Sequence, residues 1–205
     1  MQTYMPNLGA VLMAAVIAAW VGLWVTPAFA AKAEVAQTGQ TTLFADGDDG
    51  DIQAGVPLPT PRFKDNKNGT VTDKLTGLIW LKNANCFSSR PWALAVETAT
   101  TLASGQCGLM DGSSAGDWRL PNVKELQSLI DFGFFGPALS NTAGTAQWTD
   151  GNPFSGVRST EYWSSTTYVN GPDYAWSVDL GDGNARGSDH PKVDSGPVWP
   201  VRGGQ

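Results

Sequence analysis

The stretch from Gly116 to Leu126 constrains the fold most, because it predicts a change from extended chain to helix within a few residues. Trp118 and Leu120 alternate with polar neighbours, a period of two that is typical of a half-buried strand or an extended approach. Pro121 has no N–H donor and ends that extended segment. The residues after the proline are therefore expected to form a helix.

The start of that helix carries clear capping signals. Asn122 is expected to cap the first turn with its side chain, and Glu125 can accept a hydrogen bond from the backbone N–H of Asn122. The apolar residues that follow recur on one helical face: Val123, Leu126, Leu129 and Ile130. The pattern predicts a capped core helix in a mixed fold, and its side chains indicate neither a nucleophile nor a metal site.

A second helix is expected to begin near Pro91, with Ser88 or Ser89 as its cap and Gly105 at its end. Its inward face is predicted to consist of Trp92, Val96, Ala99, Leu102 and Ala103. The two helices are joined to strands throughout the rest of the domain, so we expect an α+β fold with long loops.

The chain has two cysteines, Cys86 and Cys107, which bracket the helix after Pro91. In an exported chain, a lone pair of this kind predicts one disulfide bond. A catalytic or metal-binding thiol pair is the alternative. It has little support, because the spacing is not CxxC and the single histidine, His190, lies far along the sequence.

Strands are expected on both sides of the helices. Residues 62–65 and 70–73 predict a hairpin around Asn68-Gly69, since this dipeptide accepts positive φ at both turn positions, and residues 78–81 predict a buried strand. In the last third, strands are expected at 161–168, 174–180 and 198–202, the last of them at an edge because it contains Pro200. Even-numbered side chains of 161–168 are expected to lie on the face opposite the odd-numbered ones.

Several motifs, each weak alone, occur in an order that resembles the Lcl C-terminal domain family, named after the C-terminal domain of a collagen-like Legionella adhesin. The resemblance covers residues 62–204 and rests on 68–73, 76–80, Cys86, Cys107, 117–122 with 125–126, 162–166, 175–176 and 201–204. It implies a C-type-lectin-like fold, by analogy with the group that includes formylglycine-generating enzymes. The cysteine chemistry of those enzymes is not implied, because both cysteines here precede residue 117.

The N-terminal residues 1–30 are expected to be a signal peptide. Leu8 to Val25 is an apolar run without charge, and Ala28-Phe29-Ala30 provides a small-residue site for cleavage before Ala31. A retained membrane anchor is the alternative, since the residues before the run contain no Lys or Arg. Either reading predicts export to the periplasm, the cell surface or the medium.

Residues 31–61 predict a linker or extension, because they are rich in Asp, Gly and Pro and carry too few apolar side chains for a core. The run from Asp46 to Asp51 could suggest a calcium loop, but the distal bidentate Glu of such loops is missing. We expect a solvated acidic loop and no cofactor or metal, with calcium kept as an open alternative.

Charge and motifs narrow the function. With 13 Lys and Arg against 19 Asp and Glu, the chain has a net charge of -6, which disfavours nucleic acid and anionic polymers as partners. The sequence lacks HExxH and phosphate-binding glycine motifs, and residues 112–116, which read Gly-Ser-Ser-Ala-Gly, are expected to form a flexible approach to the extended segment that follows and not a nucleophile elbow. We therefore expect an exported, adhesin-like binding module for a glycan or a protein surface, and no catalytic residue is assigned. A carbohydrate-active hydrolase, or a structural domain that forms oligomers, is the alternative.

The binding surface is predicted on the two polar loops between the last strands, because loops held by fixed strand ends commonly carry recognition. The expected ligand-binding residues are Tyr168, Asn170, Asp173, Tyr174, Asn184, Arg186, Asp189 and His190. Solvated hairpin tips without a ligand are the alternative for these loops, and residues 141–159, with Trp148 and Phe154 as aromatic anchors, are the alternative location.

Overall fold

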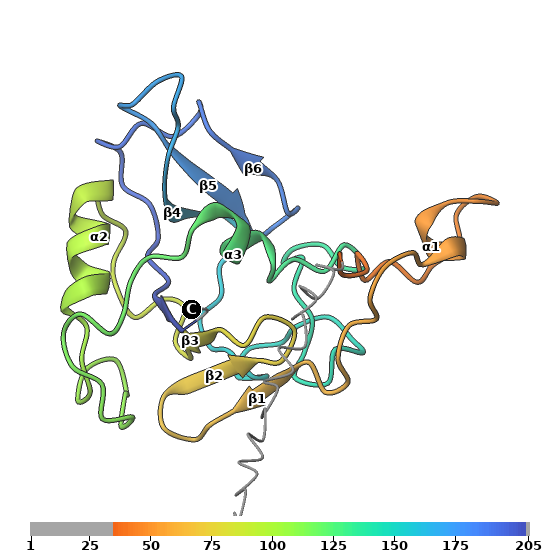
Figure 1. Cartoon of the computed structure of the whole chain (residues 1–205), viewed down its shortest axis with the longest axis horizontal. Coiled ribbons are helices and arrows are strands. Elements are labelled where there is room, and N and C mark those ends of the chain that lie inside the picture. The colour runs from red at the N-terminus through yellow and green to blue at the C-terminus, as the bar shows by residue number, and fades with distance from the viewer. Residues whose placement is uncertain (1–34, 204–205) are drawn as a thin grey trace, which may run out of the picture. The chain divides into compact units, whose positions relative to one another are not determined.

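The structure is a computed structural model that describes residues 35–203, so the expected signal peptide lies outside the described residues. Its helices are α1 (Asp49–Ile52), α2 (Trp92–Thr101) and α3 (Val123–Gln127). Its strands are β1 (Phe63–Asp65), β2 (Thr70–Asp73), β3 (Ile79–Leu81), β4 (Glu161–Thr167), β5 (Ala175–Asp179), β6 (Ala185–Arg186) and β7 (Val201–Arg202). The predicted α+β class is confirmed, with antiparallel sheets of order β1-β2-β3-β7 and β4-β5-β6 (Figure 1).

The predicted hairpin is present as β1 and β2, but its turn differs from the expected two-residue turn. Positive φ occurs at Lys67 (61°) and Gly69 (84°), and Asn68 is not among the positive-φ residues. Side chains build this longer loop, since Asp65 Oδ1 accepts the Lys67 N–H at 2.9 Å and Asn68 Oδ1 accepts the Thr70 N–H at 3.3 Å. The turn prediction was therefore correct in place and wrong in type.

The extended segment before α3 completes the edge of the first sheet. Arg119 and Val201 exchange backbone hydrogen bonds of 3.0 and 2.9 Å, on the side of β7 that does not pair with β3. Strand β7 is last in the sheet order, as predicted, but it begins after Pro200 and is shorter than the expected strand at 198–202. Trp118 and Leu120, on either side of Arg119, point into the core with 0% and 2% exposure.

The capping box of α3 is confirmed. Asn122 Oδ1 accepts the Glu125 N–H at 2.9 Å, and Glu125 Oε2 accepts the Asn122 N–H at 2.8 Å. The structure adds Arg119, whose guanidinium donates to both carboxylate oxygens of Glu125 at 2.7 Å. Burial opposes ionisation of Glu125, but the hydrogen bonds from Arg119 and Asn122 outweigh it, so its pKa lies below the usual value.

We expect Glu125→Ala to lower the free energy of unfolding by about 1–2 kcal/mol, because it removes the capping box and the partner of Arg119 together. Glu125→Gln is the matched control, since an amide can keep the box but carries no charge. Urea unfolding of both variants measures the difference. An Ala variant as stable as the wild type would show that the box contributes nothing here.

Helix α2 is present, but the predicted serine cap is wrong. Pro91 occupies the N-cap position with φ -57° and ψ 151° and makes no side-chain cap. The Trp92 N–H donates instead to the Lys192 carbonyl at 2.9 Å, while Ser88 Oγ accepts from Arg90. A distant segment therefore satisfies the first turn. The helix ends at Thr101, ahead of the expected Gly105, because Leu102 adopts an extended conformation.

The predicted alternation of faces in β4 holds at Tyr162 and Trp163, which pack into different apolar clusters, but both faces are buried. Tyr162, Trp163 and Ser164 are all 0% exposed. Tyr162 packs with Trp199 in the main core, whereas Trp163 packs with Ala95 of α2 in a second apolar cluster. The second sheet is therefore covered on both faces. The alternation of polar and apolar residues along its strands does not show which face is buried.

The predicted disulfide bond is confirmed. Cys86 and Cys107 are bonded, with their Cα atoms 5.7 Å apart. Helix α1 was not predicted; Asp48 caps it by accepting the Asp51 N–H at 2.9 Å. Within residues 35–203, no helix has the length and apolar character needed to cross a membrane.

Candidate functional site

The predicted binding residues lie around the three-stranded sheet, in the loop between β4 and β5 and in the segment around and after β6. The first loop is closed by its own backbone, because the Tyr168 N–H donates to the Tyr174 carbonyl at 3.0 Å. Asn170, Asp173 and Asp189 are exposed. Asn184 donates to Asp182 at 2.6 Å. The structure thus divides the predicted set into an aromatic part and a charged part.

The aromatic part is larger than predicted. We define the aromatic surface as Trp92, Tyr168, Tyr174, Trp176 and Lys192, all of them half-buried. The Tyr168 and Trp176 rings meet edge to face, with their centroids 5.6 Å apart. Lys192 joins the other parts, because its backbone N–H donates to the Asp173 carbonyl at 2.8 Å and its ammonium lies 4.2 Å from the centre of the Trp92 ring.

Two glycines lie against three of these rings. A Cβ added at Gly187 would lie 2.7 Å from the Tyr168 ring and 3.1 Å from the Trp176 ring, so the chain after β6 passes directly over both. The ring of Tyr174 likewise lies 3.2 Å from the Cβ position of Gly171. The rings are held by backbone rather than by other mobile side chains, which pre-organises the surface for a ligand.

The charged part gathers around Glu161, which sequence reasoning missed. Its carboxylate lies 3.4 Å from Arg186 Nε and 3.4 Å from His190 Nδ1, and Ser177 Oγ donates to it at 3.0 Å. Arg186 also pairs with Asp182 at 3.6 Å. Glu161 begins β4, a position that sequence reasoning treated only as the start of a strand.

His190 is held in its neutral form. Its ring stacks on Trp163, with centroids 3.8 Å apart, and burial lowers its pKa more than Glu161 and Asp194 raise it. The Ser177 hydroxyl donates to Glu161 rather than to His190, so the cluster contains no serine activated by a histidine base. The charged cluster therefore holds the segment after β6, which contributes Lys192 to the aromatic surface, against the sheet.

This lowered pKa predicts a loss of stability in mild acid. An unfolded His binds a proton below its usual pKa of about 6.5, whereas folded His190 resists protonation, so the free energy of unfolding should begin to fall as the pH drops through about 6.5. His190→Gln should flatten the curve in this window. Urea unfolding at several pH values measures it, and an identical slope in the two proteins would contradict the assignment.

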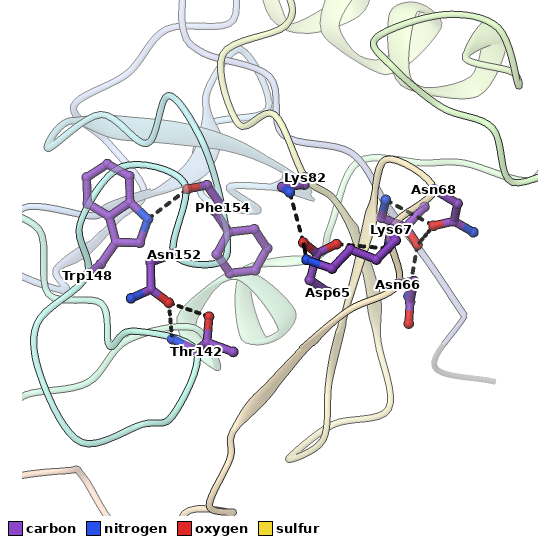
Figure 2. A network of polar contacts seen from close by, with 10 residues as sticks. Asp65, Asn66, Lys67, Asn68, Lys82, Thr142, Trp148, Asn152 and Phe154 are labelled. Atoms are coloured by element: carbon purple, nitrogen blue, oxygen red, sulfur yellow. Dashed lines mark hydrogen bonds and ion pairs between the residues drawn. The ribbon is translucent and has the colours of Figure 1, made fainter.

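A second polar feature lies beside the β1–β2 loop, where a groove of about 410 Å³ is lined by residues that include Asp65, Lys67 and Lys82. Figure 2 shows both lysines directed at Asp65, with distances of 2.8 and 2.9 Å. Burial opposes ionisation of Asp65, but these hydrogen bonds outweigh it and lower its pKa to about 2. The lysines neutralise a carboxylate of the protein itself, so this groove is a poor site for an anion.

The 141–159 loop, the alternative location for the site, is held inward. Trp148 Nε1 donates to the Phe154 carbonyl at 3.1 Å, and Thr142 pairs with Asn152 (Figure 2). Phe154 is fully buried between Phe63 and Trp199. Both aromatic residues therefore act as the predicted anchors. Across residues 35–203, no three His, Cys, Asp or Glu side chains are grouped closely enough to hold a metal ion.

Comparison with known proteins supports the resemblance noted in the sequence. No curated protein matches this chain. A family model described as the Lcl C-terminal domain matches residues 69–202, which include α2, α3, the disulfide and all residues of the aromatic surface. That family is consistent with an exported, adhesin-like binding domain. The match spans more than half of the sequence, so this chain belongs to the Lcl C-terminal domain family.

Proposed function

We propose that this chain is an exported binding module that recognises a glycan on the aromatic surface. The observation that supports it is the group of half-buried Tyr168, Tyr174 and Trp176 rings, which lie directly against the backbone at Gly171 and Gly187. Aromatic rings offer large apolar faces at low entropic cost, and the C–H faces of sugar rings can stack on them. Exposed Asn170 and Asp173 beside the rings supply hydrogen-bonding groups for hydroxyls.

Hydrolysis fits the same residues less well. Glycoside hydrolases place two carboxyl groups on either side of the scissile bond, one of them free to donate a proton. The carboxylate of Glu161 is paired with Arg186 and His190 and accepts a hydrogen bond from Ser177, so it is not free for this role. The geometry therefore favours binding over turnover.

A glycan array probed with the purified exported protein, with and without calcium, tests the proposal. We expect binding that is lost when Tyr174 and Trp176 are both replaced by Ala, since each hot-spot side chain contributes about 2 kcal/mol, or about thirtyfold in affinity. Tyr174→Phe with Trp176→Phe keeps the rings and should retain most of the binding.

Phe135→Ala is the matched control, because it removes an exposed ring (76%) far from β5 in the sequence and should leave binding unchanged. Melting temperatures of all variants separate loss of the surface from loss of the fold. Unchanged glycan binding by the double Ala variant would place the site elsewhere. Turnover of a labelled polysaccharide would instead favour the hydrolase, and a stable oligomer without any ligand would favour the structural alternative.

A further inference from the structure

A separate pocket lies between the N-terminal extension and the loops after α3. Residues 37–58 of the extension (red to orange in Figure 1) and residues 131–145 enclose a volume of about 340 Å³. This size falls in the range of small-molecule sites. The pocket lies outside the aromatic surface and shares no residue with it.

Backbone contacts hold the extension against this part of the domain. The Phe132 N–H donates to the Thr38 carbonyl at 2.8 Å. A Cβ added at Gly39 would lie 2.1 Å from Asp131 Oδ1, and one added at Gly133 would lie 2.6 Å from the Gly39 carbonyl oxygen. Only glycine permits this approach at both positions. The walls of the pocket are therefore in direct contact at one end, beside Asp131.

Asp131 is the charged residue of the pocket, and it is 2% exposed. Among residues 35–203, the Gly133 N–H is its one hydrogen-bond donor, at 3.0 Å from Oδ1. Burial raises the pKa of this carboxyl, although Gly133 and the positive charge of Arg62 act in the opposite direction. A buried carboxylate with one donor is incompletely satisfied, so its second oxygen is available to a donor from a ligand.

The remaining polar lining consists of amide and hydroxyl side chains. Side-chain amides of Gln37 and Gln53 donate to the carbonyls of Gln53 and Gly50 within the extension, which leaves their own side-chain oxygens to accept. Gln40 repeats the pattern with the Thr42 carbonyl at 3.5 Å. Leu58 and Phe134 add apolar surface to the lining. Each amide keeps a second N–H, and Thr41 and Thr145 add hydroxyls, so the lining both accepts and donates and suits a ligand that carries hydroxyls together with apolar C–H faces.

We propose that this pocket binds a single sugar residue that carries free hydroxyls and no anionic group. Hydroxyls donate to the Asp131 carboxylate and the Gln oxygens, and the C–H face of the ring contacts Leu58 and Phe134. The acceptor oxygens and the carboxylate repel sulfate and uronate groups. Fully buried Arg62 lies behind the wall, 3.2 Å from the Cβ position of Gly144, and its charge weakens the attraction of Asp131 for a simple cation.

The test is a titration of the full exported chain with glucose, galactose and mannose, beside glucuronate and glucose 6-sulfate, followed by saturation-transfer NMR. We expect at least one neutral hexose to bind in the millimolar range or tighter, and the anionic sugars not to bind. Asp131→Asn should weaken that binding by about tenfold or more, since hydrogen bonds to charged groups are the strong ones.

Thr145→Trp provides a variant that leaves the core untouched, because Thr145 is an exposed residue of the lining and a Trp side chain fills the pocket. It should abolish hexose binding at an unchanged melting temperature. The double Ala variant of Tyr174 and Trp176 should bind the hexose normally, so failure of the aromatic surface and failure of this pocket can be told apart. The proposal is overturned if no neutral hexose binds, if the anionic sugars bind as well, or if Thr145→Trp binds like the wild type.

Discussion

Replacing Asp73 with Ala should lower the free energy of unfolding by about 3–5 kcal/mol, because it leaves the guanidinium of Arg62 buried without its carboxylate. Both side chains are 0% exposed, and Arg62 Nη2 lies 3.4 Å from Asp73 Oδ2. Two other guanidinium nitrogens, Nε and Nη1, have no hydrogen-bond partner among residues 35–203. The guanidinium therefore has few other contacts that could compensate for the loss of the Asp73 carboxylate. Arg62 Nη2 also donates to the Ser128 carbonyl, which ties β1 to the end of α3.

The control for this prediction is Arg62→Met combined with Asp73→Leu, which removes both charges at similar volume. Buried ion pairs replaced in this way are often no less stable, so the double variant should unfold at higher urea concentration than Asp73→Ala. Equal stability of the single and double variants would mean that the unpaired charge is not the cause of the loss.

Replacing both Cys86 and Cys107 with Ser should lower stability by about 2–5 kcal/mol and the melting temperature by several degrees. The bond closes a separation of 21 residues around α2 and holds the loop in which Gly108 contacts Gly69. A Cβ at Gly69 would lie 2.3 Å from the Gly108 carbonyl oxygen, so this contact also shapes the groove beside the β1–β2 loop.

Thermal unfolding of the double Ser variant, compared with the wild type under oxidising and reducing conditions, measures that effect. The reduced wild type should behave like the variant. Detection of two free thiols in the denatured, unreduced protein would refute the disulfide bond.

Local features of the fold were predictable where neighbouring residues determine them. The α3 capping box needs only Asn122 and Glu125, which are three residues apart, and the sequence predicted it correctly. The start of α2 depends instead on the Lys192 carbonyl, which lies far along the chain. No local pattern can reveal such a partner, and the predicted serine cap was wrong for this reason.

The candidate site also combines features that neighbouring residues determine with features that depend on distant segments. The sequence predicted Tyr168 and Tyr174 at the strand ends that flank a loop, but Trp92 and Lys192 join the aromatic surface only through tertiary contacts. The polar pocket was missed because the composition of residues 31–61 predicts a linker, and composition does not show that Gly39 meets Asp131. Polar sites assembled from distant segments leave no periodic signal in a sequence.

Family membership and the aromatic surface both favour a role in binding, and the charge of the chain narrows the class of ligand. The Lcl C-terminal domain match is consistent with an adhesin-like domain, and it includes the loop and strand residues that carry the rings. The net charge of -6 argues against strongly sulfated chains as the ligand. We therefore expect a glycan with few or no anionic groups.

The most direct test of the binding surface is to follow the side-chain indole N–H signals of the tryptophans by NMR while adding the glycan that the array selects. Trp92 and Trp176 are half-buried members of the aromatic surface, and their signals should shift with a saturable dependence on glycan concentration. Fully buried Trp80 and Trp199 should remain unchanged and serve as internal controls. Shifts confined to Trp148, with Trp92 and Trp176 unmoved at saturation, would contradict the proposed surface.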